Sequence, residues 1–70
     1  MYSSNNETIL KTAREFFDRQ EYKKAQVLLN EIIESDDKNI DALFILANIF
    51  HINGEIGKAI KAFNKVLTLN

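Results

Sequence analysis

Few side chains in this 70-residue chain have the types and spacing that catalysis requires. His51 is the only histidine, and the chain has no cysteine. An imidazole that works as a general base or a metal ligand needs a second imidazole or a placed carboxylate, and the sequence indicates neither for His51. No glycine-rich phosphate loop is present. We therefore expect a protein that is not an enzyme and that uses no cofactor or metal, with His51 as a partly exposed residue.

One short stretch has the alternation of a calcium-binding loop. Asp37, Asn39 and Asp41 place oxygen-bearing side chains at every second position. Such a loop also needs a glycine after the third ligand and a closing glutamate, but Ala42 and Asn48 occupy those positions. We interpret the stretch as a polar linker, with Asn39 as the N-cap of the helix that follows.

The composition favours one small globular domain. The net charge is −1, which argues against nucleic acid or an anionic membrane as the partner. The first ten residues lack the basic and apolar regions of a signal peptide, and the longest apolar stretch, residues 42–52, is interrupted by Asn48 and His51. We expect no membrane insertion. The absence of cysteine fits a reducing compartment, so a cytoplasmic protein is expected.

Apolar residues recur at helical spacing along the whole chain, which predicts four helices. The first helix is expected to begin in the region 3–6, where Ser and Asn side chains can cap it. Gly54 is placed to end the third helix in a left-handed conformation. The four apolar stripes are Ile9, Ala13, Phe16 and Phe17; Tyr22, Ala25, Leu29, Ile32 and Ile33; Leu43, Leu46, Ala47 and Phe50; and Ile56, Ala59, Ile60, Phe63, Val66 and Leu67.

The second half of the chain repeats the first half without a gap. Phe16 and Ala25 return 34 residues later as Phe50 and Ala59. Identical residues at the same offset are Asn5 and Asn39, Ala13 and Ala47, Glu21 and Glu55, Lys24 and Lys58, and Asn30 and Asn64. Each "aromatic to Ala" segment spans the predicted turn between two helices, so the chain consists of two similar helix pairs.

A 34-residue period in helix pairs resembles the tetratricopeptide repeat, whose pattern is W-x2-L-G-x2-Y followed by A-x3-F and P. The second unit has Leu43-x2-Leu46-Ala47-x2-Phe50 and then Ala59-x3-Phe63, and the first has Ile9-x2-Thr12-Ala13-x2-Phe16 and then Ala25-x3-Leu29. Thr12 in place of leucine and Asp37 in place of proline make the first unit the more degenerate one.

The resemblance implies an all-α fold of two tandem helix-turn-helix repeats, with four antiparallel helices in a short right-handed solenoid. It implies a cap segment over 1–5, a first repeat over 6–39 and a second over 40–70. The paired alanines would sit where two helices approach closely, and Phe16 and Phe50 would fill the space between helices.

The resemblance also implies a concave groove that binds partners. Its lining would be Leu10, Lys11, Arg14, Phe17, Phe44, Ile45, Asn48, His51 and Ile52. Some family members grip a peptide carboxylate with Lys, Asn and Arg, but Leu10, Arg14 and Ile45 occupy the matching positions here, so this clamp is absent or heavily altered. Phe44, Ile45 and Ile52 indicate an apolar contact with an amphipathic helix. The alternative is that neighbouring side chains half-cover these residues and that they bind nothing.

A further surface is expected at the end of the predicted solenoid, because terminal repeats normally carry a polar cap. The fourth helix has apolar residues there instead: Ile60, Phe63, Val66, Leu67 and Leu69. An uncovered apolar end of this kind indicates either a cut in a longer array or a docking surface. We therefore expect a non-catalytic protein–protein interaction module that binds a protein or peptide. The alternative is a self-assembly unit that forms homo-oligomers. RNA binding would need a basic groove, for which Lys11 and Arg14 are a weak indication.

Overall fold

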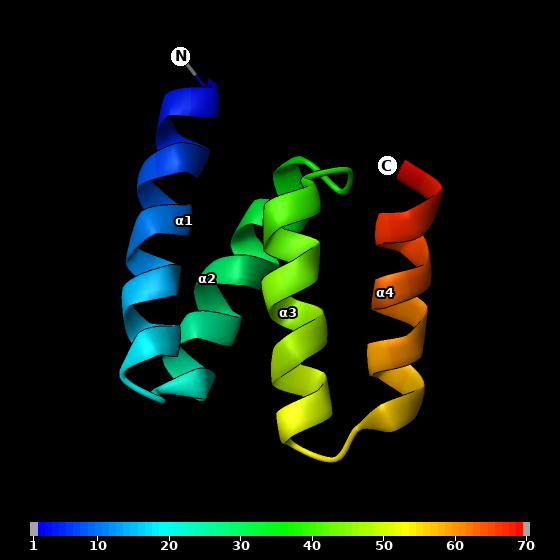
Figure 1. Ribbon diagram of the computed structural model, residues 1–70. Coiled ribbons are helices and arrows are strands. Elements are labelled where there is room, and N and C mark those ends of the chain that lie inside the picture. The colour runs from blue at the N-terminus through cyan, green and yellow to red at the C-terminus, as the bar shows by residue number, and fades with distance from the viewer. Residues whose placement is uncertain (1, 70) are drawn as a thin grey trace.

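The computed structural model describes the backbone of residues 2–69 and the side chains of residues 5–69, and its regular structure there is entirely helical. The helices are α1 (Tyr2–Asp18), α2 (Tyr22–Ser35), α3 (Ile40–Ile52) and α4 (Ile56–Leu69). Figure 1 shows that each helix runs opposite to the one before it, with α1 and α4 at the two ends of the row. The predicted all-α fold with four antiparallel helices is confirmed.

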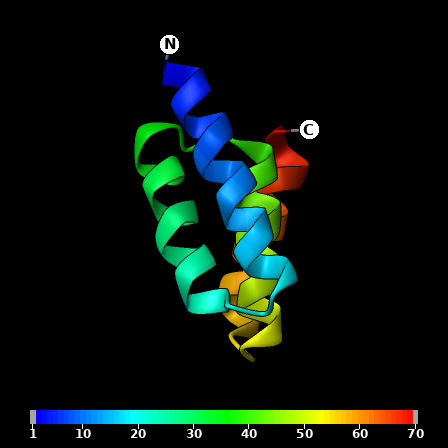
Figure 2. The ribbon, with the colours of Figure 1, turned by 90° about the vertical axis from the view of Figure 1, so that its left-hand side faces the viewer.

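The helices pack as two pairs that share one interface. α1 packs against α2, and α3 packs against α4, while α3 also contacts α2 and α1. Among the described helices, α4 packs against α3 alone. Figure 2 views the row from its α1 end, with α2 beside α1 and the second pair behind them. The molecule extends 34 × 28 × 16 Å along its principal axes.

The sequence predicted the start of α3 more accurately than the start of α1. The side chain of Asn39 accepts a hydrogen bond from the backbone N–H of Ala42 at 3.0 Å, which satisfies an otherwise unpaired donor at the start of α3. The predicted cap is confirmed. α1 begins at Tyr2, before the predicted region. Asn6 lies within α1 and accepts a hydrogen bond from Ser35 Oγ at 3.4 Å, so it links α1 to the end of α2.

The predicted N-terminal cap segment lies partly outside the described residues. The side chains of Ser3 and Ser4 lie outside the described residues, as do Met1 and Asn70 at the ends of the predicted segments.

The turns within the two helix pairs have the same construction. In the first, the N–H of Glu21 donates to the carbonyl of Phe16 at 2.8 Å, and in the second the N–H of Glu55 donates to the carbonyl of Phe50 at 2.8 Å. Each glutamate also forms an ion pair with the lysine three residues later, at 3.0 and 3.1 Å. These lysines, Lys24 and Lys58, lie over the rings of Phe16 and Phe50 at 5.6 and 5.7 Å. The repeated sequence pattern therefore encodes a repeated turn.

One residue in each turn has a left-handed backbone. Gly54 has a φ of 81°, as predicted, and its counterpart Gln20 has a φ of 64°. Glycine adopts this conformation without strain, whereas a residue with a Cβ atom is strained by roughly 1–2 kcal/mol. The first turn is thus the more strained of the two.

Exchanging these residue types should change stability in opposite directions. We expect Gln20→Gly to raise the free energy of unfolding by about 0.5–1 kcal/mol, after the greater entropy of an unfolded glycine is subtracted. Gly54→Ala should lower it by a similar amount, because a Cβ added there meets no atom within 4 Å and only the backbone is strained. Urea denaturation followed by circular dichroism measures both changes. Shifts of the same sign would contradict this explanation.

The core lies where the first pair meets α3. Its buried cluster is Ala13, Ala25, Leu29, Ile32, Ala42, Ile45, Leu46 and Ile49. The four alanines for which the sequence predicts a close approach of helices, Ala13, Ala25, Ala47 and Ala59, are all buried. Phe16 and Phe50 are half-buried and pack against this cluster. α3, apolar nearly all round, is the central helix of the fold.

Candidate functional site

The clearest difference between the two pairs lies on the outer face of their second helices. Leu29 and Ile32 of α2 are completely buried, because α2 packs against both α1 and α3. Their counterparts 34 residues later, Phe63 and Val66 of α4, are only half-buried. Because α4 packs against α3 alone among the described helices, the side of α4 that faces away from α3 is open in the part of the chain that the structure describes.

Four apolar side chains form one stripe along this open face. Ile56 is 49% exposed, Ile60 54% and Leu67 73%, and Phe63 is half-buried between them. Their spacing of four, three and four residues places them on a single side of a helix. We call Ile56, Ile60, Phe63 and Leu67 the α4 stripe.

The predicted self-association face divides into two parts. Ile60, Phe63 and Leu67 belong to the α4 stripe. Val66 and Leu69 are half-buried and follow the helical spacing of Ala59 and Ala62, which are buried against α3. Ile56, which the prediction of this face left out, belongs to the stripe. The spacing of Ile56 from Ile60 and Phe63 was a signal that could have included it.

The α4 stripe continues onto α3 through one aromatic contact. Phe44 is 51% exposed, and its ring meets that of Phe63 edge to face, with the ring centroids 5.9 Å apart. Such pairs are favourable beyond the area they bury. Phe44 and the α4 stripe together form one apolar surface across two helices, which we call the α3–α4 surface.

Three residues of the predicted groove belong to the core or its edge. Ile45 is only 8% exposed and is part of the buried cluster. Its prediction as a partner-binding residue is therefore corrected: Ile45 faces the first helix pair, and a partner cannot reach it. Leu10 and Phe17 are half-buried against the same cluster, and the ring of Phe17 meets that of Tyr22 with centroids 5.4 Å apart.

The rest of the predicted groove, apart from Phe44 and Ile52, is polar. Arg14 forms an exposed ion pair with Asp41 at 3.7 Å, which bridges α1 and α3. The Asn48 amide donates to the carbonyl of Phe44 at 2.9 Å. Lys11, His51 and Ile52 are exposed. Arg14 therefore lies next to the start of α3. The apolar surface lies elsewhere, where Phe44 of α3 contacts Phe63 of α4.

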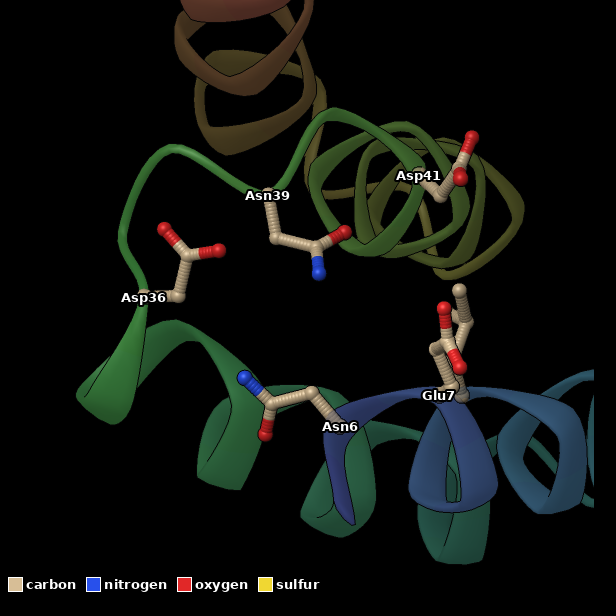
Figure 3. A pocket seen from close by; sticks show the side chains of 6 residues that line it. Asn6, Glu7, Asp36, Asn39 and Asp41 are labelled. Atoms are coloured by element: carbon tan, nitrogen blue, oxygen red, sulfur yellow. The ribbon is translucent and has the colours of Figure 1, made fainter. Parts of the chain in front are cut away.

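A hollow of about 230 Å³ lies between the start of α1, the linker and the start of α3. It is lined by Asn6, Glu7, Leu10, Asp36, Asn39 and Asp41. Figure 3 shows the polar side chains around it.

Several of the side chains around this hollow already have partners within the chain. Asn39 caps α3, Asp41 faces Arg14, and Asp36 accepts from the backbone N–H of Lys38 at 3.2 Å. Asp37, the remaining residue of the calcium-like alternation, faces Lys65 at 4.0 Å. Between residues 5 and 69, no group of three His, Asp or Glu side chains is arranged to hold a metal ion.

The α3–α4 surface is the strongest candidate site, since it combines large apolar side chains with high exposure. None of the helices within residues 2–69 is long and apolar enough to cross a membrane. Comparisons with protein-family models, curated proteins and solved structures found no match.

Proposed function

We propose that this chain is a non-catalytic protein–protein interaction module that binds an amphipathic helix on its α3–α4 surface. The observation that carries the proposal is the continuous exposure of Phe44, Ile56, Ile60 and Leu67 on two packed helices. Exposed apolar surfaces of this kind mark interaction sites, and an apolar face between two helices suits a third helix.

The proposal includes the finer fold: two tetratricopeptide-type repeats, 6–39 and 40–70, in a short right-handed solenoid. It is supported by the ungapped 34-residue offset and by the two turns with matching hydrogen bonds, ion pairs and ring contacts. In such an array each repeat covers the previous one. A partner helix is then expected to pack on the second helix pair as α3 packs on the first pair.

The face that α3 turns toward the first pair indicates what a partner helix should present. Ala42, Ile45 and Ile49 are buried there and belong to the shared core cluster. They are spaced three and four residues apart, on one side of α3. A partner helix should therefore carry a narrow, uncharged apolar stripe with one small residue.

A synthetic peptide tests this directly. The probe has the sequence of residues 39–53, with Leu43, Ala47 and Phe50 on the other face replaced by lysine or glutamine for solubility. We expect it to become helical when mixed with the protein and to shift the backbone amide NMR signals of α3 and α4. Ile60→Glu should weaken binding by about tenfold or more, because a carboxylate would be buried without a partner.

A matched control distinguishes specific binding at the α3–α4 surface from non-specific apolar association. Val27 is an exposed apolar residue on α2, so Val27→Glu should leave peptide affinity unchanged. Phe44→Glu should weaken binding as Ile60→Glu does, with helicity retained. Absence of peptide binding, or equal loss with Val27→Glu and Ile60→Glu, would overturn the proposal.

A further inference from the structure

The spacing of the α4 stripe allows it to pair with itself. Ile60 and Phe63 lie equally far from the midpoint between Lys61 and Ala62, and so do Ile56 and Leu67. If two copies of α4 run antiparallel about a two-fold axis at that midpoint, Ile56 meets Leu67 of the second copy. Ile60 then meets Phe63 of the second copy. Every residue of the stripe has an apolar partner in this arrangement, as an isologous interface requires.

Charge does not oppose this pairing. The ionisable side chains of α4 are Lys58, Lys61 and Lys65, and helical spacing places all three on the side away from the stripe. Lys58 pairs with Glu55 at 3.1 Å and Lys65 with Asp37 at 4.0 Å, both within the chain. Two stripes can therefore meet without burying a charge or bringing lysines together at the contact, either of which would be costly.

The outer face of α1 in a second copy is unsuited to packing on the α4 stripe. The face with which α3 covers the first pair includes Ala42, Ile45 and Ile49. The residues 34 positions earlier on α1 are Thr8, Lys11 and Glu15, all polar and exposed. α1 of a second copy thus cannot dock on α4 as α3 docks on α2, because it would bring a lysine and a glutamate against an apolar face. Head-to-tail stacking of copies is disfavoured.

We infer that the occupant of the α3–α4 surface is a second copy of this chain, held in an antiparallel, two-fold α4–α4 contact. This inference rests on the proposed function, since it names the partner of the same surface. Phe44 of each copy, which touches Phe63 of its own chain, flanks Ile60 of the other. Because a two-fold contact uses the same patch on both copies, assembly stops at the dimer.

The interface is small, so the dimer is expected to be weak. α4 has 14 residues and is about 21 Å long, which limits the buried area to below the roughly 1,200–2,000 Å² of stable interfaces.

Sedimentation equilibrium from about 10 µM to about 1 mM covers the relevant range. We expect the mass to rise from 8.1 kDa toward twice that value with concentration. Ile60→Glu should remain at 8.1 kDa with unchanged helicity, and Val27→Glu should dimerise like the parent chain.

Cysteine variants test the orientation, since the chain has no native cysteine. Ile56→Cys and Leu67→Cys proteins, mixed and oxidised, should form mainly the mixed disulfide, because position 56 faces position 67 across the two-fold axis. A predominance of disulfides within either variant alone would overturn the antiparallel arrangement.

The remaining outcomes separate this inference from the proposed function. A mass of 8.1 kDa at the highest concentration would overturn the dimer, while the peptide titration would still decide whether the surface binds a helix. Growth beyond the dimer would overturn two-fold closure. A dimer that persists in Ile60→Glu would overturn the choice of surface.

Discussion

Replacing Ile49 by alanine should lower the free energy of unfolding by about 2–5 kcal/mol. Ile49 is completely buried and belongs to the cluster that joins α3 to the first helix pair. The substitution removes three carbon atoms from a site enclosed by other helices, so the lost burial is accompanied by the cost of a cavity. Domains of this size are stabilised by only about 4–10 kcal/mol in total, so the variant should be substantially unfolded at room temperature.

The same change three residues later is the matched control. Ile52 lies on α3 as well, but half of its side chain is exposed. Ile52→Ala makes an identical chemical change in the same helix and should cost less than about 1 kcal/mol. Urea denaturation monitored by circular dichroism gives both values. Equal losses at the two positions would mean that Ile49 does not hold the two helix pairs together as described.

Much of the fold could be predicted because the sequence carries local signals for it. The apolar spacing of each helix, the cap at Asn39 and the glycine at position 54 depend on interactions within a few residues, and all three are found in the structure. The repeated Phe, Glu and Lys positions predicted two turns in equivalent places, and the two turns indeed have matching contacts. Local chemistry of this kind requires no knowledge of the tertiary packing.

The candidate surface was harder to predict, because it depends on which side of α3 faces which neighbour. A helix that is apolar nearly all round does not indicate this from its own sequence, and Ile45 was therefore placed on the surface although it is buried. The early start of α1 has a different, local cause: residues 2–6 include neither proline nor glycine, so nothing local stops the helix there. Ile56 was left out of the α4 face although its spacing from Ile60 and Phe63 fits that face.

A second large effect is expected at a completely buried alanine of α2. Ala25 of α2 is completely buried in the cluster that joins α1, α2 and α3. Ala25→Leu adds three carbon atoms at a position with no exposed surface, which should cost about 1–3 kcal/mol or more through displaced helices and strained rotamers. α2 cannot move aside, because α1 and α3 both pack against it. The measurement is again the free energy of unfolding in urea.

The equivalent change in the second pair, Ala59→Leu, tests whether the large cost of Ala25→Leu arises because α2 is packed between α1 and α3. Ala59 occupies the same place in its turn and is also buried, but α4 packs against α3 alone among the described helices. In Ala59→Leu, α4 can shift outward to make room, so we expect a loss at least about 1 kcal/mol smaller than that of Ala25→Leu.

The difference should be measured at concentrations where the protein is monomeric, since a second copy on the α4 stripe would hold α4 from its other side. If so, the cost of Ala59→Leu should rise with protein concentration, whereas that of Ala25→Leu should stay constant. Equal costs for the two variants in the monomer would contradict the open outer face of α4, on which both the proposed function and the proposed dimer depend.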